Sequence, residues 1–277
     1  MDLFEDTVIE HAPALQIKIR TNELPLDRAL RRVKTTLEAG HPAVVAFSSG
    51  KDSSCLAAVV LSAARQLVAA GAKCPPIVVL HGNTGVEQPE MVDLAEQELA
   101  KMHAYAKEHK IPLQTRISHP SLADSFPVRV LGGRALPSFP DGNSDCSTSW
   151  KVLPNQRAQK QVFAELEGSG QWQAPVVMTG VRNAESIARD QKIAKRGEVA
   201  EGLWQNDFGA QRLSPLLDWT VDDVWEFIGM ANAGIYDSYS DFAETMRIYR
   251  DGGGDTCVIV ADLKSQGNSK PCGTRTG

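Results

Sequence analysis

Apolar and polar positions alternate along the chain in blocks that predict a strand, a loop and a helix in that order. Between residues 26 and 37 apolar side chains recur every three or four positions, which predicts a helix that ends before Gly40. The apolar run 43–47 (AVVAF) predicts a short buried strand. An Ala/Leu-rich stretch over 53–70 then predicts a second helix.

The same order repeats further along the chain. Residues 76–80 predict a second strand, 91–105 a long amphipathic helix, 111–117 a third strand and 174–179 a fourth. Strands that alternate with helices favour a parallel sheet covered on both faces. The sequence therefore predicts an α/β fold with a doubly wound, mostly parallel sheet.

The segments around the fourth strand are less regular. Residues 118–149 are rich in Pro, Gly and Ser, and we expect a lid or substrate loop there, because long stretches without regular structure in compact domains are usually functional. A polar segment over 190–211 leads to a predicted helix at about 221–231, and the tail from Asp251 predicts irregular structure.

Length and composition allow one substantial core. The chain has 277 residues, of which 42% are hydrophobic and 23% charged. We divide it into an N-terminal helical segment (1–40), a main domain (41–230) and a C-terminal cysteine-containing extension (231–277). No apolar run approaches the roughly 20 residues of a membrane helix, and the first residues lack the pattern of a secretion signal. We expect a cytoplasmic protein without membrane contact, and a homo-oligomer is one option.

Charge and cysteine content narrow the classes of partner. A net charge of −5 argues against coating nucleic acid through bulk electrostatics, although residues 182–196 are locally basic and could follow a phosphate backbone or form a solvated surface. An odd number of scattered cysteines is unlike a secreted disulfide framework. They are Cys55, Cys74, Cys146, Cys257 and Cys272, of which we interpret the first two as buried or incidental thiols.

A candidate phosphate loop follows the first predicted strand. A loop that leaves a strand and opens a helix presents free backbone N–H groups and the positive end of the helix dipole to an anion. Within the loop, Gly50 permits close backbone approach and Lys51 supplies positive charge, while hydroxyls come from Ser48, Ser49, Ser53 and Ser54. The alternative is a serine-capped helix in which Lys51 and Asp52 form a solvated pair.

This segment resembles the Ser-Gly-Gly-Lys-Asp-Ser motif of the adenine-nucleotide alpha-hydrolase superfamily, with Ser49 in place of the first glycine. The resemblance implies a Rossmann-like ATP pyrophosphatase that cleaves ATP to AMP and pyrophosphate, with ATP and Mg²⁺ as cofactors. It assigns residues 48–54 to ATP binding and makes Lys51 and Asp52 catalytic. The hydroxyl and Cβ of Ser49 would alter the fit around the phosphates.

Three later segments resemble phosphoadenylylsulfate (PAPS) reductases. They are 81–90 (HGNTGVEQPE), the Gly180-Val181-Arg182 segment with Glu185, Ser186 and Arg189, and 215–225 (PLLDWTVDDVW). The resemblance adds Asn83, Thr84 and Gly180 to the ATP site. Arg182 is a candidate catalytic partner of a phosphate or else part of a surface salt bridge to Glu185 or Asp190.

Two of these assignments have plain structural alternatives. Asn83 and Thr84 lie after a strand, where α/β sheets hold ligands, and could contact the ribose or base, or could simply form a turn. Trp219 and Trp225 are interpreted as core anchors rather than nucleotide stackers.

The cysteine-bearing segments point to a particular branch. PAPS reductases end in a Glu-Cys-Gly sequence that does not occur here, whereas 145–151 (DCSTSWK) and 271–277 (PCGTRTG) resemble the DndC and SspD proteins of bacterial DNA phosphorothioation. That resemblance implies adenylation of a DNA backbone phosphate, a cysteine desulfurase as sulfur donor and other phosphorothioation proteins as partners. It also implies a [4Fe-4S] cluster on Cys146, Cys257 and Cys272, with Cys146 as an alternative persulfide carrier assisted by Lys151.

Two other functions stay open at this point. One is sulfate assimilation, as a PAPS reductase or as the small subunit of sulfate adenylyltransferase. The other is a non-catalytic, nucleotide-sensing scaffold subunit, in which Ser49 marks a degraded loop.

Overall fold

The fold is an α/β sandwich around one six-stranded sheet. A computed structural model describes residues 23–134, 147–183, 187–205 and 209–252. The strand order is β3-β2-β1-β4-β6-β5, with all neighbours parallel except β5 and β6. The strands are β1 (Ala43–Phe47), β2 (Ile77–Gly82), β3 (Leu113–Ser118), β4 (Val176–Met178), β5 (Trp204–Gln205) and β6 (Gln211–Leu213).

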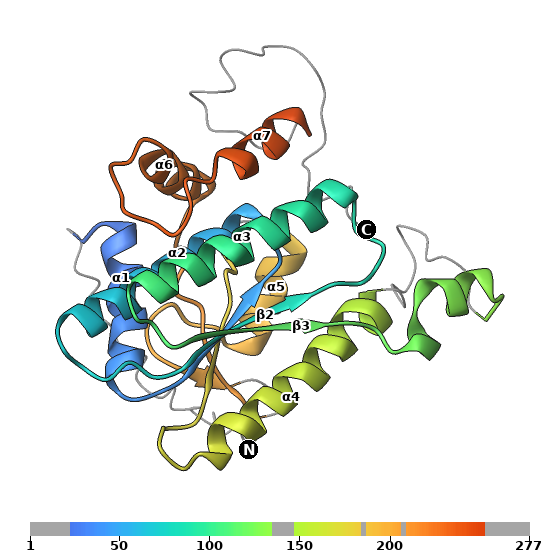
Figure 1. The fold of residues 1–277 in the computed structure, drawn as a ribbon, viewed down its shortest axis with the longest axis horizontal. Coiled ribbons are helices and arrows are strands. Elements are labelled where there is room, and N and C mark those ends of the chain that lie inside the picture. Colours follow the sequence, from blue (N-terminus) through green and yellow to red (C-terminus); the bar gives the residue numbers. More distant parts are fainter. Residues whose placement is uncertain (1–22, 135–146, 184–186, 206–208, 253–277) are drawn as a thin grey trace, which may run out of the picture.

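Helices cover both faces of this sheet (Figure 1). The α-helices are α1 (Pro25–Glu38), α2 (Lys51–Ala69), α3 (Pro89–Glu108), α4 (Leu153–Gly168), α5 (Ile187–Arg196), α6 (Val221–Asn232) and α7 (Ala243–Asp251). Three short helical segments lie at η1 (Leu122–Asp124), η2 (Pro127–Leu131) and η3 (Ser147–Val152). In Figure 1, α1, α2 and α3 lie above the sheet and α4 below it.

The alternating side chains of β1 explain why helices pack on both faces of the sheet. Val45 and Phe47 belong to the large core with α1, α2, α3 and α6, whereas Val44 packs in a smaller cluster with Val162 and Phe163 of α4. Because successive side chains of a strand point to opposite faces, an apolar run buries both faces only when helices flank the sheet on each side. The predicted doubly wound α/β fold is confirmed.

The regular elements largely follow the apolar pattern, and the missed ones are short or polar. The strand predicted over 43–47 is confirmed residue for residue, and the predicted helices appear as α1, α2, α3 and α6. The prediction did not include α4, α5, α7, β5 or β6. The expected loop over 118–149 contains, in its described part, the short helical segments η1 and η2 and the start of η3.

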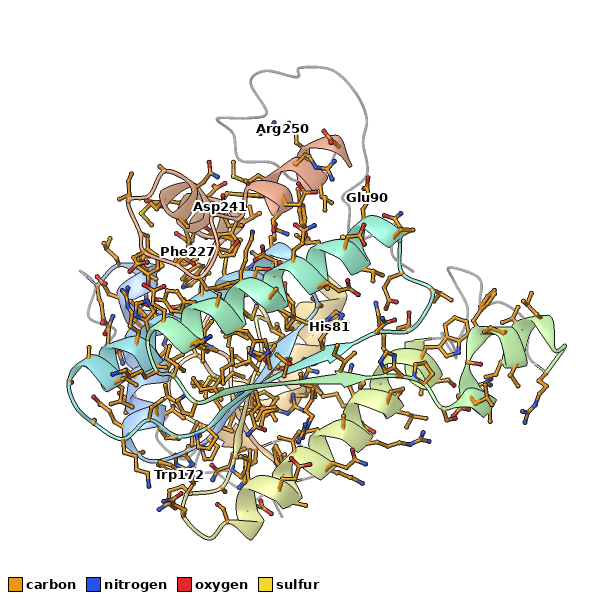
Figure 2. The ribbon with its side chains drawn as sticks, viewed as in Figure 1. His81, Glu90, Trp172, Phe227, Asp241 and Arg250 are labelled. Carbon is orange, nitrogen blue, oxygen red and sulfur yellow. The ribbon has the colours of Figure 1, made fainter. Side chains whose placement is uncertain are left out.

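The segments on either side of the main domain share its core. Ala29 and Val33 of α1 are buried in the same cluster as the sheet residues, and so is Phe242, just before α7. Figure 2 shows Phe227 of α6 among the side chains on the same side of the sheet. The boundaries proposed at residues 40 and 230 stay predictions, but both flanking segments contribute to one hydrophobic core.

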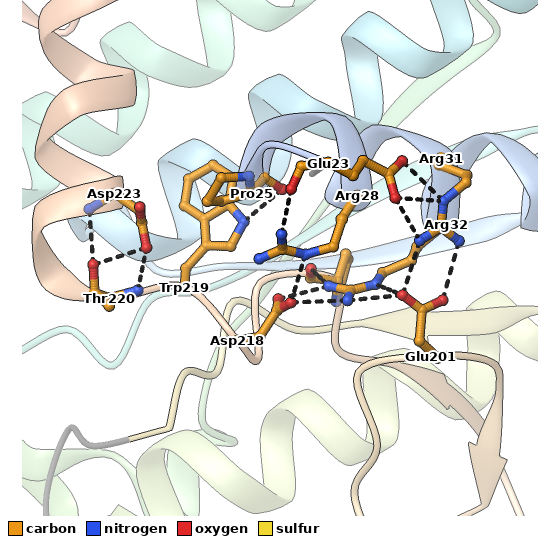
Figure 3. Close-up of polar contacts among 11 residues, drawn as sticks. Glu23, Pro25, Arg28, Arg31, Arg32, Glu201, Asp218, Trp219, Thr220 and Asp223 are labelled. Atoms are coloured by element: carbon orange, nitrogen blue, oxygen red, sulfur yellow. Dashed lines mark hydrogen bonds and ion pairs between the residues drawn. The ribbon is translucent and has the colours of Figure 1, made fainter. Parts of the chain in front are cut away.

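A charged network fastens α1 to the segment before α6 (Figure 3). The guanidinium of Arg32, which is 5% exposed, donates to Asp218 at 2.7 Å, to Glu201 at 2.9 Å and to the Pro215 carbonyl at 2.8 Å. Arg28 donates to the same Asp218 carboxylate at 2.9 Å. Burial by itself would raise the pKa of Asp218, but the hydrogen bonds and charge of Arg32 and Arg28 outweigh burial and lower it.

The α2 helix is apolar enough, by length and composition, to be compared with a membrane span. However, 72% of the apolar 18-residue stretch in this helix is buried inside the protein, as expected of a core helix between the sheet and a second layer of helices. The motif residues Trp219 and Trp225 are also buried, at 2% and 6% exposure, which confirms their interpretation as core anchors.

Candidate functional site

The strand order places a topological switch point at β1 and β4, and the region outside the carboxyl ends of these two strands is called the crevice here. From β1 the chain winds outward through β2 to β3, and it then returns to place β4 on the other side of β1. Ligands of open α/β sheets bind at the carboxyl ends of the strands, where the winding direction reverses. The residues that leave β1 (48–50) and those that leave β4 (179–182) therefore meet at the position most suited to a ligand.

The loop after β1 is closed by its own serines. Gly50 is the residue before the first turn of α2, and the hydroxyl of Ser53 donates to its carbonyl at 2.9 Å. The Ser48 N–H donates to the Ser53 hydroxyl at 3.1 Å, and the two hydroxyls lie 3.1 Å apart. These contacts hold the loop in a tight bend over the N-terminus of α2, where N–H groups favour an anion.

Ser49 has a left-handed backbone conformation, with φ of 58°. This is the position at which the superfamily motif has a glycine, and glycine adopts positive φ without a steric cost. The side chain is 2% exposed, and its hydroxyl donates to the Ser48 carbonyl at 2.6 Å. The bend of the loop is therefore retained despite the missing glycine, at the expense of local backbone strain.

Arg182 links the exit of β4 to the first turn of α2. Its guanidinium forms an ion pair with Asp52, which also lies 3.3 Å from the ammonium of Lys51. Arg182 is 5% exposed. Two cations and one carboxylate thus converge at the crevice. The structure brings together all three non-cysteine residues expected to be catalytic.

Gly180 explains how β4 can approach α2 so closely. A Cβ at this position would lie 2.8 Å from the Asp52 carbonyl oxygen and 3.0 Å from its carbon. Only a residue without a side chain fits against the backbone there. Gly180 therefore sets the spacing across the crevice.

Tyr249 of α7 also contacts the loop, and no motif in the sequence predicted this contact. Its hydroxyl accepts a hydrogen bond from the Lys51 N–H at 3.2 Å, and the Lys51 ammonium lies 5.2 Å from the centre of its ring. The partners are far apart in sequence and joined only by the packing of α7, so no local pattern could have predicted the contact.

The other residues expected to bind ATP are differently placed. Asn83 accepts a hydrogen bond from the Gly85 N–H at 2.8 Å, and the Thr84 N–H donates to the Glu87 carboxylate at 2.9 Å, as in a turn. Burial would raise the pKa of Glu87, but these hydrogen bonds outweigh it and lower the pKa. Ser54 is fully buried.

His81 lies at the carboxyl end of β2 (Figure 2). Its Nδ1 is 3.1 Å from the Phe47 carbonyl oxygen, so this nitrogen carries the proton and the ring is held against the end of β1. Burial lowers the pKa of His81, which keeps the imidazole neutral at neutral pH.

The cysteines divide into two groups. Cys55 and Cys74 are buried, as expected, and burial raises the pKa of both thiols, that of Cys74 to about 11. Cys146, Cys257 and Cys272 lie outside the described residues. Within the described ranges, no group of three or more His, Cys, Asp or Glu side chains could hold a metal ion.

The basic stretch 182–196 is partly described. Arg196, in the last turn of α5, forms an ion pair with Glu198 at 2.5 Å, and Lys195 is exposed. The side chains of Arg189 and Lys192 lie outside the described part. A phosphate track along this segment stays a prediction.

Fold and site together define a Rossmann-like α/β nucleotide-binding domain, with a Lys-Asp-Arg constellation at the switch point of the sheet. Residues 42–240 match the phosphoadenosine phosphosulfate reductase domain, and the chain belongs to that family. No curated protein matches the chain.

Several solved structures are similar in fold. FMN adenylyltransferase from Candida glabrata, in complex with FMN and the ATP analogue AMPCPP, has 15% identity over 92% of this chain and 74% of its own, with a TM-score of 0.47. The U34-tRNA thiolase NcsA from Methanococcus maripaludis, with its [4Fe-4S] cluster, has 13% identity over 83% and 72%, with a TM-score of 0.43. NAD⁺ synthetase from Burkholderia pseudomallei has 16% identity over 86% of both chains, with a TM-score of 0.40.

Proposed function

We propose that the chain is an ATP pyrophosphatase whose reaction transfers AMP to an acceptor oxygen. The observation that carries the proposal is the convergence of Lys51, Asp52 and Arg182 at the N-terminus of α2, in the crevice between β1 and β4. Such a site suits a polyphosphate, because backbone N–H groups and two cations can share its charge.

The proposal gives a task to each side chain. An acceptor oxygen attacks the α-phosphorus of ATP, the bond from that phosphorus to the bridging oxygen breaks, and pyrophosphate leaves with the electron pair. Lys51 and the first N–H groups of α2 stabilise the charge that builds up on the leaving pyrophosphate. Arg182, oriented by Asp52, is placed to contact the α-phosphate.

Mg²⁺ would be bound mainly by the phosphates. This cation needs few protein ligands, because it retains several waters and takes phosphate oxygens from the nucleotide. A site of this kind is compatible with the described residues, which hold no dedicated group of metal ligands.

The acceptor in our proposal is a DNA backbone phosphate, as in DNA phosphorothioation. Adenylation converts a non-bridging phosphate oxygen into a good leaving group, and a sulfur nucleophile supplied by a cysteine desulfurase then displaces AMP. The support is the resemblance of residues 145–151 and 271–277 to DndC and SspD proteins. Binding of a [4Fe-4S] cluster by Cys146, Cys257 and Cys272, and assembly with other phosphorothioation proteins, belong to the same proposal.

The test of the pyrophosphatase is pyrophosphate release from ATP by anaerobically purified protein. We expect Lys51→Ala to reduce release by at least a hundredfold, in the range seen when one charge-stabilising donor is removed. Lys34→Ala is the matched control, since Lys34 forms an exposed pair with Glu38 on α1. Equal rates for wild type and Lys51→Ala would refute the assignment of the loop, and no turnover by either would favour a scaffold subunit.

The test of the acceptor is a comparison of DNA, sulfate and PAPS in the same assay. Pyrophosphate release that is stimulated by DNA, with transfer of label from α-³²P ATP to the DNA, supports the phosphorothioation assignment. Stimulation by sulfate would indicate sulfate adenylylation instead, and thiol-dependent sulfite formation from PAPS would indicate a reductase. Iron and sulfide measured on the same samples, with Cys257→Ser as the comparison, test the cluster independently of turnover.

A further inference from the structure

Tyr249 contacts a backbone N–H group of the phosphate loop that the proposed function assigns to the phosphates of ATP. The Lys51 N–H, at the start of α2, donates to the Tyr249 hydroxyl at 3.2 Å. A Cβ on Gly50 would lie 3.4 Å from the same hydroxyl, so the phenol sits directly against the loop backbone. Since one N–H group makes one strong hydrogen bond, a phosphate oxygen and this hydroxyl cannot both accept it.

The aromatic ring engages the cation of the same residue. The Lys51 ammonium lies 5.2 Å from the centre of the Tyr249 ring, within the range of a cation–π contact. One side chain of α7 therefore satisfies both the backbone donor and the side-chain charge that the proposed function assigns to pyrophosphate.

The start of α7 is firmly anchored, whereas its end is more open. Phe242 has a left-handed backbone with φ of 55° and is fully buried, and its N–H donates to the Ser240 hydroxyl at 3.0 Å. Ser240 in turn donates to the buried Glu98 of α3 at 2.9 Å. A bulky residue is rarely found at positive φ, so tertiary contacts impose the direction in which α7 leaves this point.

At the other end of α7, Tyr249 is half-buried and Arg250 and Asp251 are exposed. Figure 2 shows Arg250 at the outer side of the helix. The Tyr249 ring packs edge-on against Trp225 of α6, with ring centres 5.4 Å apart. Of the last four residues of α7 only Ile248 is buried, whereas Ser240, Phe242 and Thr245 at the other end are all held in the core.

We propose that Tyr249 is an internal competitor for the polyphosphate of ATP, so that occupation of the loop displaces the last turn of α7. This inference rests on the proposed function and adds a regulatory contact to that site. It couples occupation of the phosphate loop to the position of α7.

The test is the affinity for inorganic pyrophosphate, measured by isothermal titration calorimetry on the full chain. We expect Tyr249→Phe to bind roughly fivefold tighter than wild type, because a competing neutral hydrogen bond of ordinary strength is removed. Tyr236→Phe is the matched control: the Tyr236 hydroxyl donates to Ser62 at 2.7 Å, away from the loop, and we expect wild-type affinity. Equal or weaker binding by Tyr249→Phe would overturn the inference and make Tyr249 a ligand or a bystander.

Lys51→Ala separates this inference from the function on which it rests. If wild type binds pyrophosphate and Lys51→Ala does not, the loop is the site, and the Tyr249→Phe result then decides the inference alone. If neither wild type nor Tyr249→Phe binds pyrophosphate, the proposed function fails and the inference fails with it.

Trp225 provides a second readout that does not depend on affinity. Displacement of Tyr249 removes this ring contact from Trp225, so pyrophosphate should change tryptophan emission in wild type and not in Trp225→Phe. Binding without any change in emission would mean that Tyr249 stays in place, which contradicts competition.

Discussion

From the backbone conformation of Ser49 we predict that glycine is more stable than alanine at this position, which reverses the usual order. At an ordinary position, Ala is more stable than Gly, because glycine loses more backbone entropy on folding, about 0.5–1 kcal/mol. A residue with a Cβ at the left-handed φ of Ser49 costs about 1–2 kcal/mol, which glycine avoids. We therefore expect the free energy of unfolding of Ser49→Gly to exceed that of Ser49→Ala by about 0.5–1 kcal/mol.

The comparison of the two variants isolates the backbone term. Both lose the hydroxyl that donates to the Ser48 carbonyl, so that hydrogen bond cancels between them. Urea unfolding should show a higher midpoint for Ser49→Gly with an unchanged slope, and thermal unfolding a difference of roughly 2 °C. Ala equal to or more stable than Gly would refute the strained conformation.

Ser169 is the matched control for this pair. It ends α4 with an ordinary φ of −71°, and its hydroxyl donates to the Leu166 carbonyl at 2.7 Å, a local bond like that of Ser49. Here Ser169→Ala should be the more stable variant, by about 0.5–1 kcal/mol. The opposite order at the two serines would tie the effect to backbone conformation rather than to loss of a hydroxyl.

Two further predictions concern backbone spacing and charge. Gly180→Ala should destabilise the protein by about 1–3 kcal/mol and slow pyrophosphate release, because its Cβ would lie 2.8 Å from the Asp52 carbonyl oxygen. The control is Gly229→Ala: a Cβ there would meet open space in α6, and we expect it to stabilise the protein by up to about 1 kcal/mol. Asp218→Asn should cost about 2 kcal/mol at pH 7, since it weakens hydrogen bonds to the Arg32 guanidinium. The pKa of Asp218 is lowered by folding, so its contribution is complete above about pH 4, the unfolded value, and is lost as pH falls through the folded pKa. Urea unfolding should therefore show wild type and Asp218→Asn converging below pH 4, and a constant gap would contradict the assigned pKa.

Local sequence determined the elements that carry strong periodicity. The run 43–47 is short and rich in valine, which favours a buried strand, and the spacing over 26–37 favours an amphipathic helix, so β1 and α1 were predicted from local pattern. The position of the phosphate loop between a strand and a helix also followed, because the motif is contiguous. In contrast, β5 and β6 are too short for any periodicity to be detected, and they form only by pairing with each other and with β4.

Tertiary structure decided which distant residues meet at the site. Arg182 forms an ion pair with Asp52, a contact that no sequence neighbourhood could indicate, because β1 and β4 are adjacent in the sheet. Tyr249 reaches Lys51 only through the imposed turn at Phe242 and the packing of α7. Periodicity and contiguous motifs act over a few residues and can be read from the chain, whereas contacts between strand ends and between layers depend on topology, which only the folded protein specifies.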